Sequence, residues 1–333
     1  MIFSMREKVI LRELSKDSRT SMSRMARLIG CSYVTVGKVL DRLREKLDIR
    51  FVLELDPTRL GILQRQLLMI KFRKKPPVEW LEQVFAREKN VNAAYLTEGQ
   101  FDVVVFVAES DPVRYALWEN LLKQNLSDYG AIVSSSDLSY FSFGYMTVND
   151  YFIDNIMVPL KKKEKELLKL LNENSRISYS KLARRLNLTE PTIRYKIFRL
   201  VKRGIIKRFT IAVQKPPSEY IIVFFERWIS CTRRFEERAA LSRKYRINFD
   251  EQMPILTTFQ MSAPLVGSWG NFIIGLFDNR GDALAKAVHK QKEIYADESY
   301  EERHARIIRP LKGLFTIRNL DIKENYNIVK WQQ

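Results

Sequence analysis

The chain has 333 residues, 46% of them hydrophobic, and 57 lysines and arginines against 39 aspartates and glutamates, a formal net charge of +18. That length suits two to four domains, and that charge favours a polyanionic partner such as nucleic acid or an anionic membrane. No apolar run approaches the roughly 20 residues of a spanning helix, the first eight residues lack a signal-peptide core, and Cys31 and Cys231 show neither CxxC nor metal-ligand spacing. We therefore expect a cytoplasmic protein with no membrane attachment and no bound metal.

An internal repeat organises the sequence. Residues 7–49 align without a gap with residues 164–206, at a shift of 157 positions, and the matched pairs include Ser18 with Ser175. Similarity at one fixed shift indicates that a structural unit occurs twice. We expect the two halves of the chain to share one organisation.

Each copy begins with three segments whose apolar residues recur at helical spacing. In the second copy these residues are Leu167, Leu168 and Leu171, then Leu182 and Leu186, then Ile193, Ile197 and Leu200. Ser178 and Thr189 are of the types that cap helix N-termini, and Pro191 suits a first helical turn. The sequence predicts three helices per copy, followed by a small β-wing at residues 47–55 and 205–213.

Four stretches of the second copy carry a resemblance to a known family: Asn174-Ser175-Arg176-Ile177-Ser178, Leu182-Ala183-Arg184, Thr189-Glu190-Pro191-Thr192 and Gly204-Ile205-Ile206. They resemble the helix-turn-helix of the Lrp/AsnC family of transcription regulators, and the first copy resembles it more loosely. The resemblance implies that a ferredoxin-like βαββαβ domain, which makes the dimer, follows each helix-turn-helix.

The segments after each helical unit support that order independently. In the first half we expect strands and helices at 66–72, 78–89, 93–96, 103–107, 114–126 and 132–143, and in the second half at 220–228, 234–245, 256–261, 272–277, 283–295 and 314–320. The predicted fold class is α+β, with two tandem copies of a winged helix-turn-helix plus a ferredoxin-like domain. The predicted domains are residues 1–60, 61–155, 156–216 and 217–333.

The positive charge is concentrated in the second helical unit. Residues 156–216 hold 17 basic against 4 acidic residues, a net charge of +13, whereas residues 1–60 hold 13 against 8, a net charge of +5. Basic side chains that neutralise phosphates supply much of a protein's affinity for DNA. This distribution favours double-stranded DNA as the partner.

The third helix of the second copy is the predicted reading helix, because its N-terminal part would approach base edges while flanking cations hold the backbone. We assign Thr192, Tyr195 and Lys196 to base reading. The residues assigned to supporting or phosphate contacts are Arg194, Arg199, Lys202, Arg203, Arg184, Arg185, Lys207 and Arg208. Each of them is also of a type that occurs as an ordinary solvated surface charge.

The equivalent helix of the first copy is less suited to DNA. It offers Lys38 and Arg42, but Gly37 weakens the helix by about 1 kcal/mol relative to alanine, and Asp41 would face phosphates unfavourably. The first copy is therefore predicted to bind DNA weakly, to read a different half-site, or to serve as a structural partner. We prefer weak DNA contact through Lys38 and Arg42.

The resemblance also implies an effector site. In the family, an amino acid binds near a turn of the form glycine, any residue, aromatic, aspartate, and Gly99-Gln100-Phe101-Asp102 fits that form. Gly99 and Asp102 are therefore candidate effector residues, although an aspartate in a hairpin turn more often stabilises only the turn. The counterpart in the second half, Gly267-Ser268-Trp269-Gly270, lacks the aspartate.

Other functions remain open. The sequence has no P-loop, GxSxG, HExxH or dinucleotide motif, so we predict no enzyme activity, no catalytic residues and no cofactor. One exception is a tetrapyrrole decarboxylase of the sirohaem pathway built on Lrp-like modules, in which His304 with Arg303, Arg306 and Arg309 would meet a carboxylated macrocycle. A second alternative function is that of a non-specific chromatin-coating or RNA-binding protein. Assembly is predicted as a homodimer or as an intramolecular pseudo-dimer.

Overall fold

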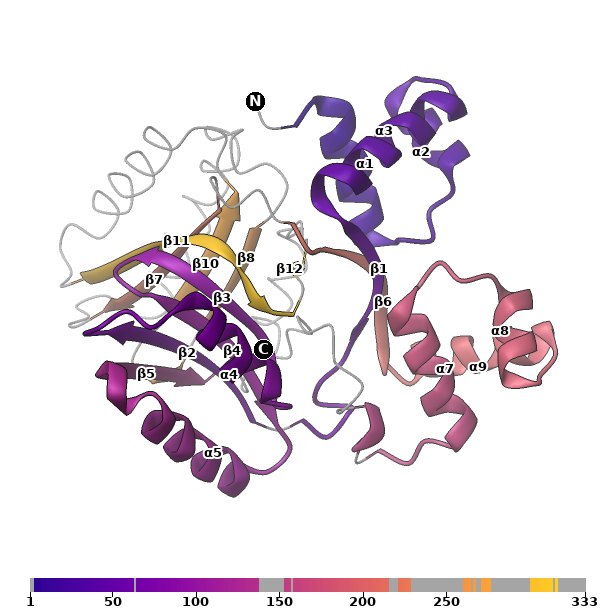
Figure 1. Cartoon of the computed structure of the whole chain (residues 1–333). Helices are drawn as coiled ribbons and strands as arrows, with labels where there is room; N and C mark the ends of the chain where they lie inside the picture. The colour runs from indigo at the N-terminus through magenta and orange to yellow at the C-terminus, as the bar shows by residue number, and fades with distance from the viewer. Residues whose placement is uncertain are drawn as a thin grey trace, which may run out of the picture.

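A computed structural model of the whole chain describes residues 3–62, 64–137, 153–156, 158–215, 221–228, 260–264, 266–267, 271–276, 300–313 and 315–316. Two helical units lie beside a large sheet (Figure 1). Within the described ranges, no helix is both long and apolar enough to cross a bilayer.

Both helical units contain the three predicted helices. The first has α1 (Met5–Lys16), α2 (Met22–Ile29) and α3 (Tyr33–Leu47), and the second has α7 (Lys162–Glu173), α8 (Tyr179–Leu186) and α9 (Glu190–Lys202). Ser178 accepts a hydrogen bond from the Lys181 amide and begins α8, and Thr189 accepts one from the Thr192 amide and begins α9. These contacts confirm the predicted caps.

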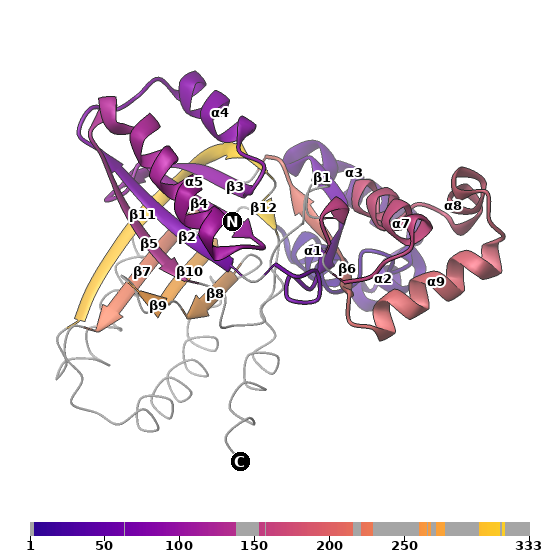
Figure 2. The ribbon, with the colours of Figure 1, turned by 90° about the horizontal axis from the view of Figure 1, so that it is seen from below.

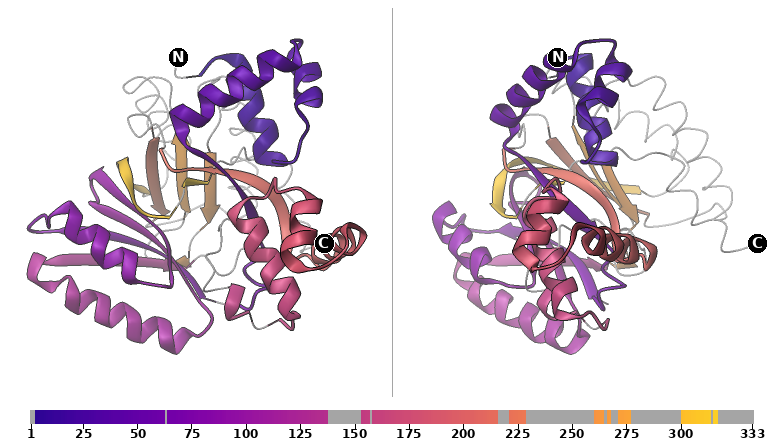
Figure 3. Two further views of the ribbon diagram at one scale, coloured as in Figure 1. Left: turned by 45° about the vertical axis from the view of Figure 1, so that its right-hand side comes forward. Right: turned by 90° about the vertical axis from the view of Figure 1, so that its right-hand side faces the viewer.

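The two wing strands pair with each other instead of forming separate wings. β1 (Ile49–Leu55) runs antiparallel to β6 (Ile206–Val213), and the short β12 (Phe315–Thr316) extends this sheet beside β6. Figure 3 shows one helical unit on each side of this ladder. The apolar side chains of both units form a single core, which includes Leu14, Leu43, Leu168, Leu200 and Ile211.

The first half of the large sheet has the predicted βαββαβ order. Its elements are β2 (Gln64–Phe72), α4 (Val78–Arg87), β3 (Val91–Gly99), β4 (Val103–Glu109), α5 (Pro112–Asn125), the short η1 (Ser127–Tyr129) and β5 (Ala131–Asp137). The strand order is β3-β4-β2-β5, with every neighbouring pair antiparallel. α4 and α5 cover one face of these strands (Figure 2), and Leu81, Phe85 and Leu122 are buried there.

The second half repeats the strand order. Its strands are β7 (Ile221–Trp228), β8 (Gln260–Pro264), β9 (Val266–Gly267), β10 (Asn271–Leu276) and β11 (Tyr300–Lys312), arranged as β8-β10-β7-β11. The helices predicted at 234–245 and 283–295 lie outside the described residues. The two halves are joined where β11 pairs with β3 and β5 pairs with β9, which makes one nine-stranded sheet of the described strands. This intramolecular joining corresponds to the predicted pseudo-dimer.

One predicted element was wrong. We placed the closing strand of the second half at 314–320, but that strand is β11, at Tyr300–Lys312, and β12 belongs to the wing sheet. β11 contains charged residues throughout, including Glu301, Glu302 and Arg303, so it lacks the apolar alternation that predicts a strand. It is a strand because β7 and β3 pair with it along both edges.

Candidate nucleic-acid interface

An approximate two-fold relation links the helical units at their joint. The Ser18 amide donates to the carbonyl oxygen of Phe209, and the Ser175 amide donates to that of Phe51, both at 2.8 Å. The hydroxyl oxygens of Ser18 and Ser175 lie 2.7 Å apart, and their separation of 157 residues equals the sequence repeat. Two repeat-equivalent residues can meet in this way only at the symmetry axis, so the joint holds the units as a two-fold pair.

The residues beside the axis, Arg19 and Arg176, make unequal contacts. The Arg19 side chain donates from Nε to the carbonyl oxygen of Ser175 at 2.7 Å and lies over the ring of Phe209 at 4.6 Å. Arg176 lies over the ring of Phe51 at 5.1 Å, but its Nη1 atom is buried with no hydrogen-bond partner among the described residues. Burial lowers the pKa of both guanidinium groups, and Arg44 lowers that of Arg176 further. The two helical units are thus related by the two-fold axis in their backbone hydrogen bonds, whereas the side-chain contacts of Arg19 and Arg176 differ.

The reading helix α9 presents a row of exposed residues away from its core face. Ile193, Ile197 and Leu200 are buried, while Tyr195 is 59% exposed and Phe198 is 61% exposed. At a spacing of three or four residues, the exposed row comprises Pro191, Tyr195, Phe198 and Lys202. α9 lies at the end of the molecule far from the nine-stranded sheet (Figure 2).

The predicted cations on α9 flank that row, and Arg184 and Arg185 lie on the preceding helix α8. Arg194 lies over the Tyr179 ring at 4.1 Å, and Arg199 lies over the Tyr195 ring at 5.8 Å. Arg185 is 3.7 Å from a carboxylate oxygen of Glu173. The side chains of Arg184, Arg185, Arg194, Arg199 and Lys202 are exposed, and those of Thr192, Lys196 and Arg203 are half-buried. Their contact with DNA stays a prediction.

Two of the predicted phosphate contacts have carboxylate partners from the first half of the chain, and their contact with DNA stays a prediction. Arg208 Nε is 2.9 Å from a carboxylate oxygen of Glu54, its partner in the β1–β6 ladder, and the two side chains are 17% and 3% exposed. Lys207 Nζ is 3.6 Å from a carboxylate oxygen of Asp56. The first half therefore supplies carboxylates to both cations, because β6 pairs with β1 instead of projecting as a free wing.

Sequence reasoning missed Phe198. We assigned the polar and aromatic positions around it to the interface and passed over this phenylalanine, although it lies three residues after Tyr195 and is exposed. A helical projection could have found it, because Phe198 falls opposite the apolar face of Ile193 and Leu200. Val201 is also partly exposed, at 43%.

The corresponding row on α3 differs chemically. The exposed residues at equivalent positions are Val34, Lys38, Asp41 and Glu45, and Asp41 lies 3.6 Å from Arg44. Lys38 and Arg42 are exposed, as the predicted role requires. Two carboxylates in the outward row disfavour close approach to phosphates, so the two units offer unequal surfaces to a polyanion.

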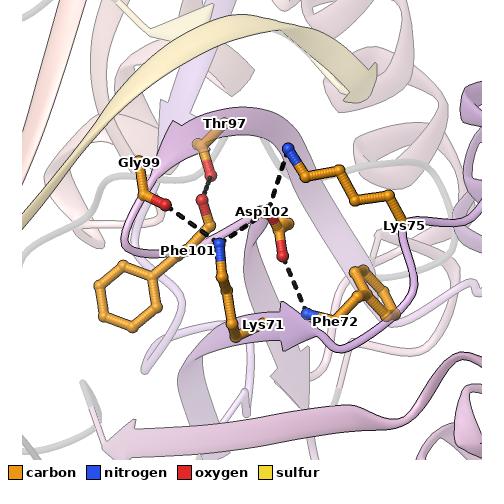
Figure 4. A network of polar contacts seen from close by, with 7 residues as sticks. All are labelled: Lys71, Phe72, Lys75, Thr97, Gly99, Phe101 and Asp102. Carbon is orange, nitrogen blue, oxygen red and sulfur yellow. Dashed lines mark hydrogen bonds and ion pairs between the residues drawn. The ribbon is translucent and has the colours of Figure 1, made fainter.

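The turn from Gly99 to Asp102 forms a closed polar network (Figure 4). The Asp102 carboxylate is 6% exposed, accepts a hydrogen bond from the Phe72 amide at 2.8 Å and lies 3.1 Å from Lys71 Nζ. Lys71 also donates to the carbonyl oxygen of Gly99 at 3.1 Å. Gly99 has φ +136, and a Cβ atom there would lie 3.0 Å from the carbonyl oxygen of His304. These contacts give Asp102 a role in holding the turn, and effector binding by Gly99 and Asp102 stays a prediction.

Replacing Asp102 should destabilise the fold. Asp102→Ala removes the acceptor of the buried Phe72 amide and the partner of Lys71, and an unsatisfied buried donor costs about 1–3 kcal/mol. Asp102→Asn keeps an oxygen acceptor and should lose less. Thermal melts of both variants measure this, and an unchanged melting temperature for Asp102→Ala would contradict the structural role.

The basic residues considered for a tetrapyrrole lie on β11 beside this turn. Arg306 is ion-paired with Glu98, and Arg309 Nη2 is 2.9 Å from a carboxylate oxygen of Glu82. Arg303 lies over the ring of Phe101 at 6.0 Å. Two of the three arginines therefore already have carboxylate partners. Across the described ranges, no group of three or more His, Cys, Asp or Glu side chains is placed to hold a metal ion.

Comparison with known proteins agrees with this geometry. A family model described as winged helix-turn-helix DNA-binding matches residues 160–207. An uncharacterised HTH-type transcriptional regulator of Pyrococcus horikoshii is 40% identical over 68 residues, which are 20% of this chain and 43% of the relative. The HTH-type transcriptional regulator LysM of Sulfurisphaera tokodaii is 36% identical over 55 residues, 16% of this chain and 39% of the relative. The chain thus spans less than half the length of these relatives.

A whole-chain likeness exists among solved structures. The siroheme decarboxylase NirDL aligns with a TM-score of 0.55 at 14% identity, covering 98% of this chain and 100% of that one. At that identity the likeness concerns the fold alone, and it agrees with two tandem copies of one helical and sheet unit. With its repeat, its paired helical units and its joined sheets, the chain consists of two tandem copies of one helical and sheet unit, and residues 160–207 match a winged helix-turn-helix DNA-binding family model.

Proposed function

We propose that the chain is a sequence-specific DNA-binding transcription regulator whose main DNA contacts come from the second helix-turn-helix. The observation that carries the proposal is the gathering of basic residues on that unit, 17 against 4 acidic residues over positions 156–216. The exposed row of α9 lies among these cations. In this proposal the sheet domains serve assembly and the sensing of a small molecule such as an amino acid.

The pairing of the units supports this proposal. Helix-turn-helix proteins commonly place two reading helices about a two-fold axis, because the two halves of a duplex site are related in the same way. Here the Ser18–Ser175 contact and the β1–β6 ladder provide that axis within one chain. That two chains also pair with each other is a separate proposal, and the DNA-binding role does not require it.

Retardation and footprinting of duplex DNA test the proposal. At low ionic strength we expect the chain to retard double-stranded fragments and to protect a discrete site, with the logarithm of the affinity falling linearly as the logarithm of the salt concentration rises. Uniform protection of every fragment would indicate a coating protein instead. If no duplex is retarded, the chain is not a DNA-binding regulator.

A tetrapyrrole decarboxylase is the second candidate, favoured by the whole-chain fold likeness to NirDL. Arg306 and Arg309 already have carboxylate partners, with which the acid groups of a macrocycle would have to compete. Titration with sirohaem separates the candidates. We expect no absorbance shift, and a shift accompanied by carbon dioxide release would support the decarboxylase.

A further inference from the structure

The outward rows of the two reading helices differ in chemistry although their backbones are related by a two-fold axis. On α9 the row centres on two aromatic side chains, Tyr195 and Phe198, which are 59% and 61% exposed. At the repeat-equivalent positions α3 carries Lys38 and Asp41. Two identical helical units related by a two-fold axis select a palindromic DNA site, whereas two units with different outward side chains select different half-sites.

The aromatic pair on α9 is unusual for a purely electrostatic contact. A side chain that only neutralises phosphate needs a positive charge, and an exposed phenylalanine offers none. The apolar feature that DNA presents in the major groove is the 5-methyl group of thymine, which apolar side chains contact when they read that base. Phe198 is flanked by Arg194 and Arg199, one on each side along the helix, so cations would hold the backbone while the ring meets the groove.

We propose that one chain binds a non-palindromic duplex in which Phe198, with Tyr195, reads thymine methyl groups in the half-site under α9, while α3 has no aromatic side chain at the two equivalent positions. This inference rests on the proposed function and specifies its substrate. The carboxylate of Asp41, at the position equivalent to Phe198, has no apolar surface to offer a methyl group, and the apolar residue in the α3 row is the smaller Val34. The thymine dependence is therefore larger in the half of the site under α9.

Replacing thymine by deoxyuridine removes the methyl group and leaves the hydrogen-bonding edges of the base unchanged, so it isolates this contact. In the footprinted site, we expect deoxyuridine in one half to weaken binding by about fourfold for each contacted methyl group. Deoxyuridine in the other half should weaken binding less. Equal losses from both halves, or no loss from either, would overturn the inference.

Phe198→Ala and Asp41→Ala form a matched pair at equivalent, exposed positions, so neither should disturb the core. Phe198→Ala should discriminate less between the thymine and deoxyuridine duplexes than the wild type does, because one of the two reading rings is gone. Asp41→Ala should keep the wild-type ratio of the two affinities. A Phe198→Ala protein that discriminates as strongly as the wild type would overturn the assignment to this residue.

The outcomes separate this inference from the proposed function. If the wild-type chain retards duplex DNA but ignores the thymine methyl groups, the reading role of Phe198 is wrong and the DNA-binding role stands. If it retards no duplex at all, both are wrong. Circular dichroism of each variant confirms that a change in affinity does not reflect unfolding.

Discussion

Removing Lys196 and Arg199 together should weaken DNA binding by roughly 100-fold or more, because each charge-assisted hydrogen bond contributes about 1.5–3 kcal/mol where it is formed. Both residues belong to the α9 surface, and Arg199 is exposed. The matched double variant on α3, Lys38→Ala with Arg42→Ala, should have a smaller effect, because Asp41 and Glu45 already disfavour phosphates there. Affinity measured by fluorescence anisotropy at several salt concentrations gives both values.

The salt dependence adds a second readout. If Arg199 contacts a phosphate, the slope of log affinity against log salt should become shallower by about 0.9 when it is removed. A base contact by Lys196 should show instead as a loss of discrimination between sites. Equal effects from the α9 and α3 pairs would contradict the asymmetry between the units.

Arg208→Ala should destabilise the protein by up to about 3–5 kcal/mol, since it removes one partner of a largely buried ion pair. The Glu54 carboxylate is only 3% exposed and lies 2.9 Å from Arg208 Nε. Because this pair spans β1 and β6, its loss acts on the contact between the helical units. Denaturant unfolding followed by circular dichroism measures the free energy of unfolding.

Two controls sharpen this prediction. Arg208→Lys keeps a positive charge near Glu54 and should cost less than the alanine variant. Lys207→Ala removes the neighbouring pair with Asp56, whose side chains are 30% and 13% exposed, and should cost under about 1 kcal/mol because solvent screens such pairs. A stability of Arg208→Ala equal to that of the parent chain would show that the joint does not depend on this pair.

Local signals predicted the helices well. The caps at Ser178 and Thr189 and the apolar spacing of Ile193, Ile197 and Leu200 depend on residues close in sequence, and the structure confirms them. The repeat predicted the tandem fold, because two copies of one sequence form two copies of one structure. The division into four domains at particular residues stays a prediction.

Pairing between distant strands was harder to predict. The alternation in residues 205–213 indicates a strand but does not say whether β6 pairs locally or with β1, about 150 residues earlier. For that reason Lys207 and Arg208 were assigned to DNA although they lie beside Asp56 and Glu54. β11 was missed because it is stabilised as a strand by pairing with β3 and β7, and its own composition does not indicate a strand.

The covalent link between the two halves changes how the paired state responds to dilution. In an assembly of separate subunits, the fraction associated falls as the protein becomes scarce, by mass action. Here the strands of the β1–β6 ladder belong to one polypeptide, so each finds its partner at a high effective concentration whatever the number of copies in the cell. A helical unit therefore cannot be exchanged for that of another molecule without unfolding. The two unlike helical units of one chain stay together from synthesis onward.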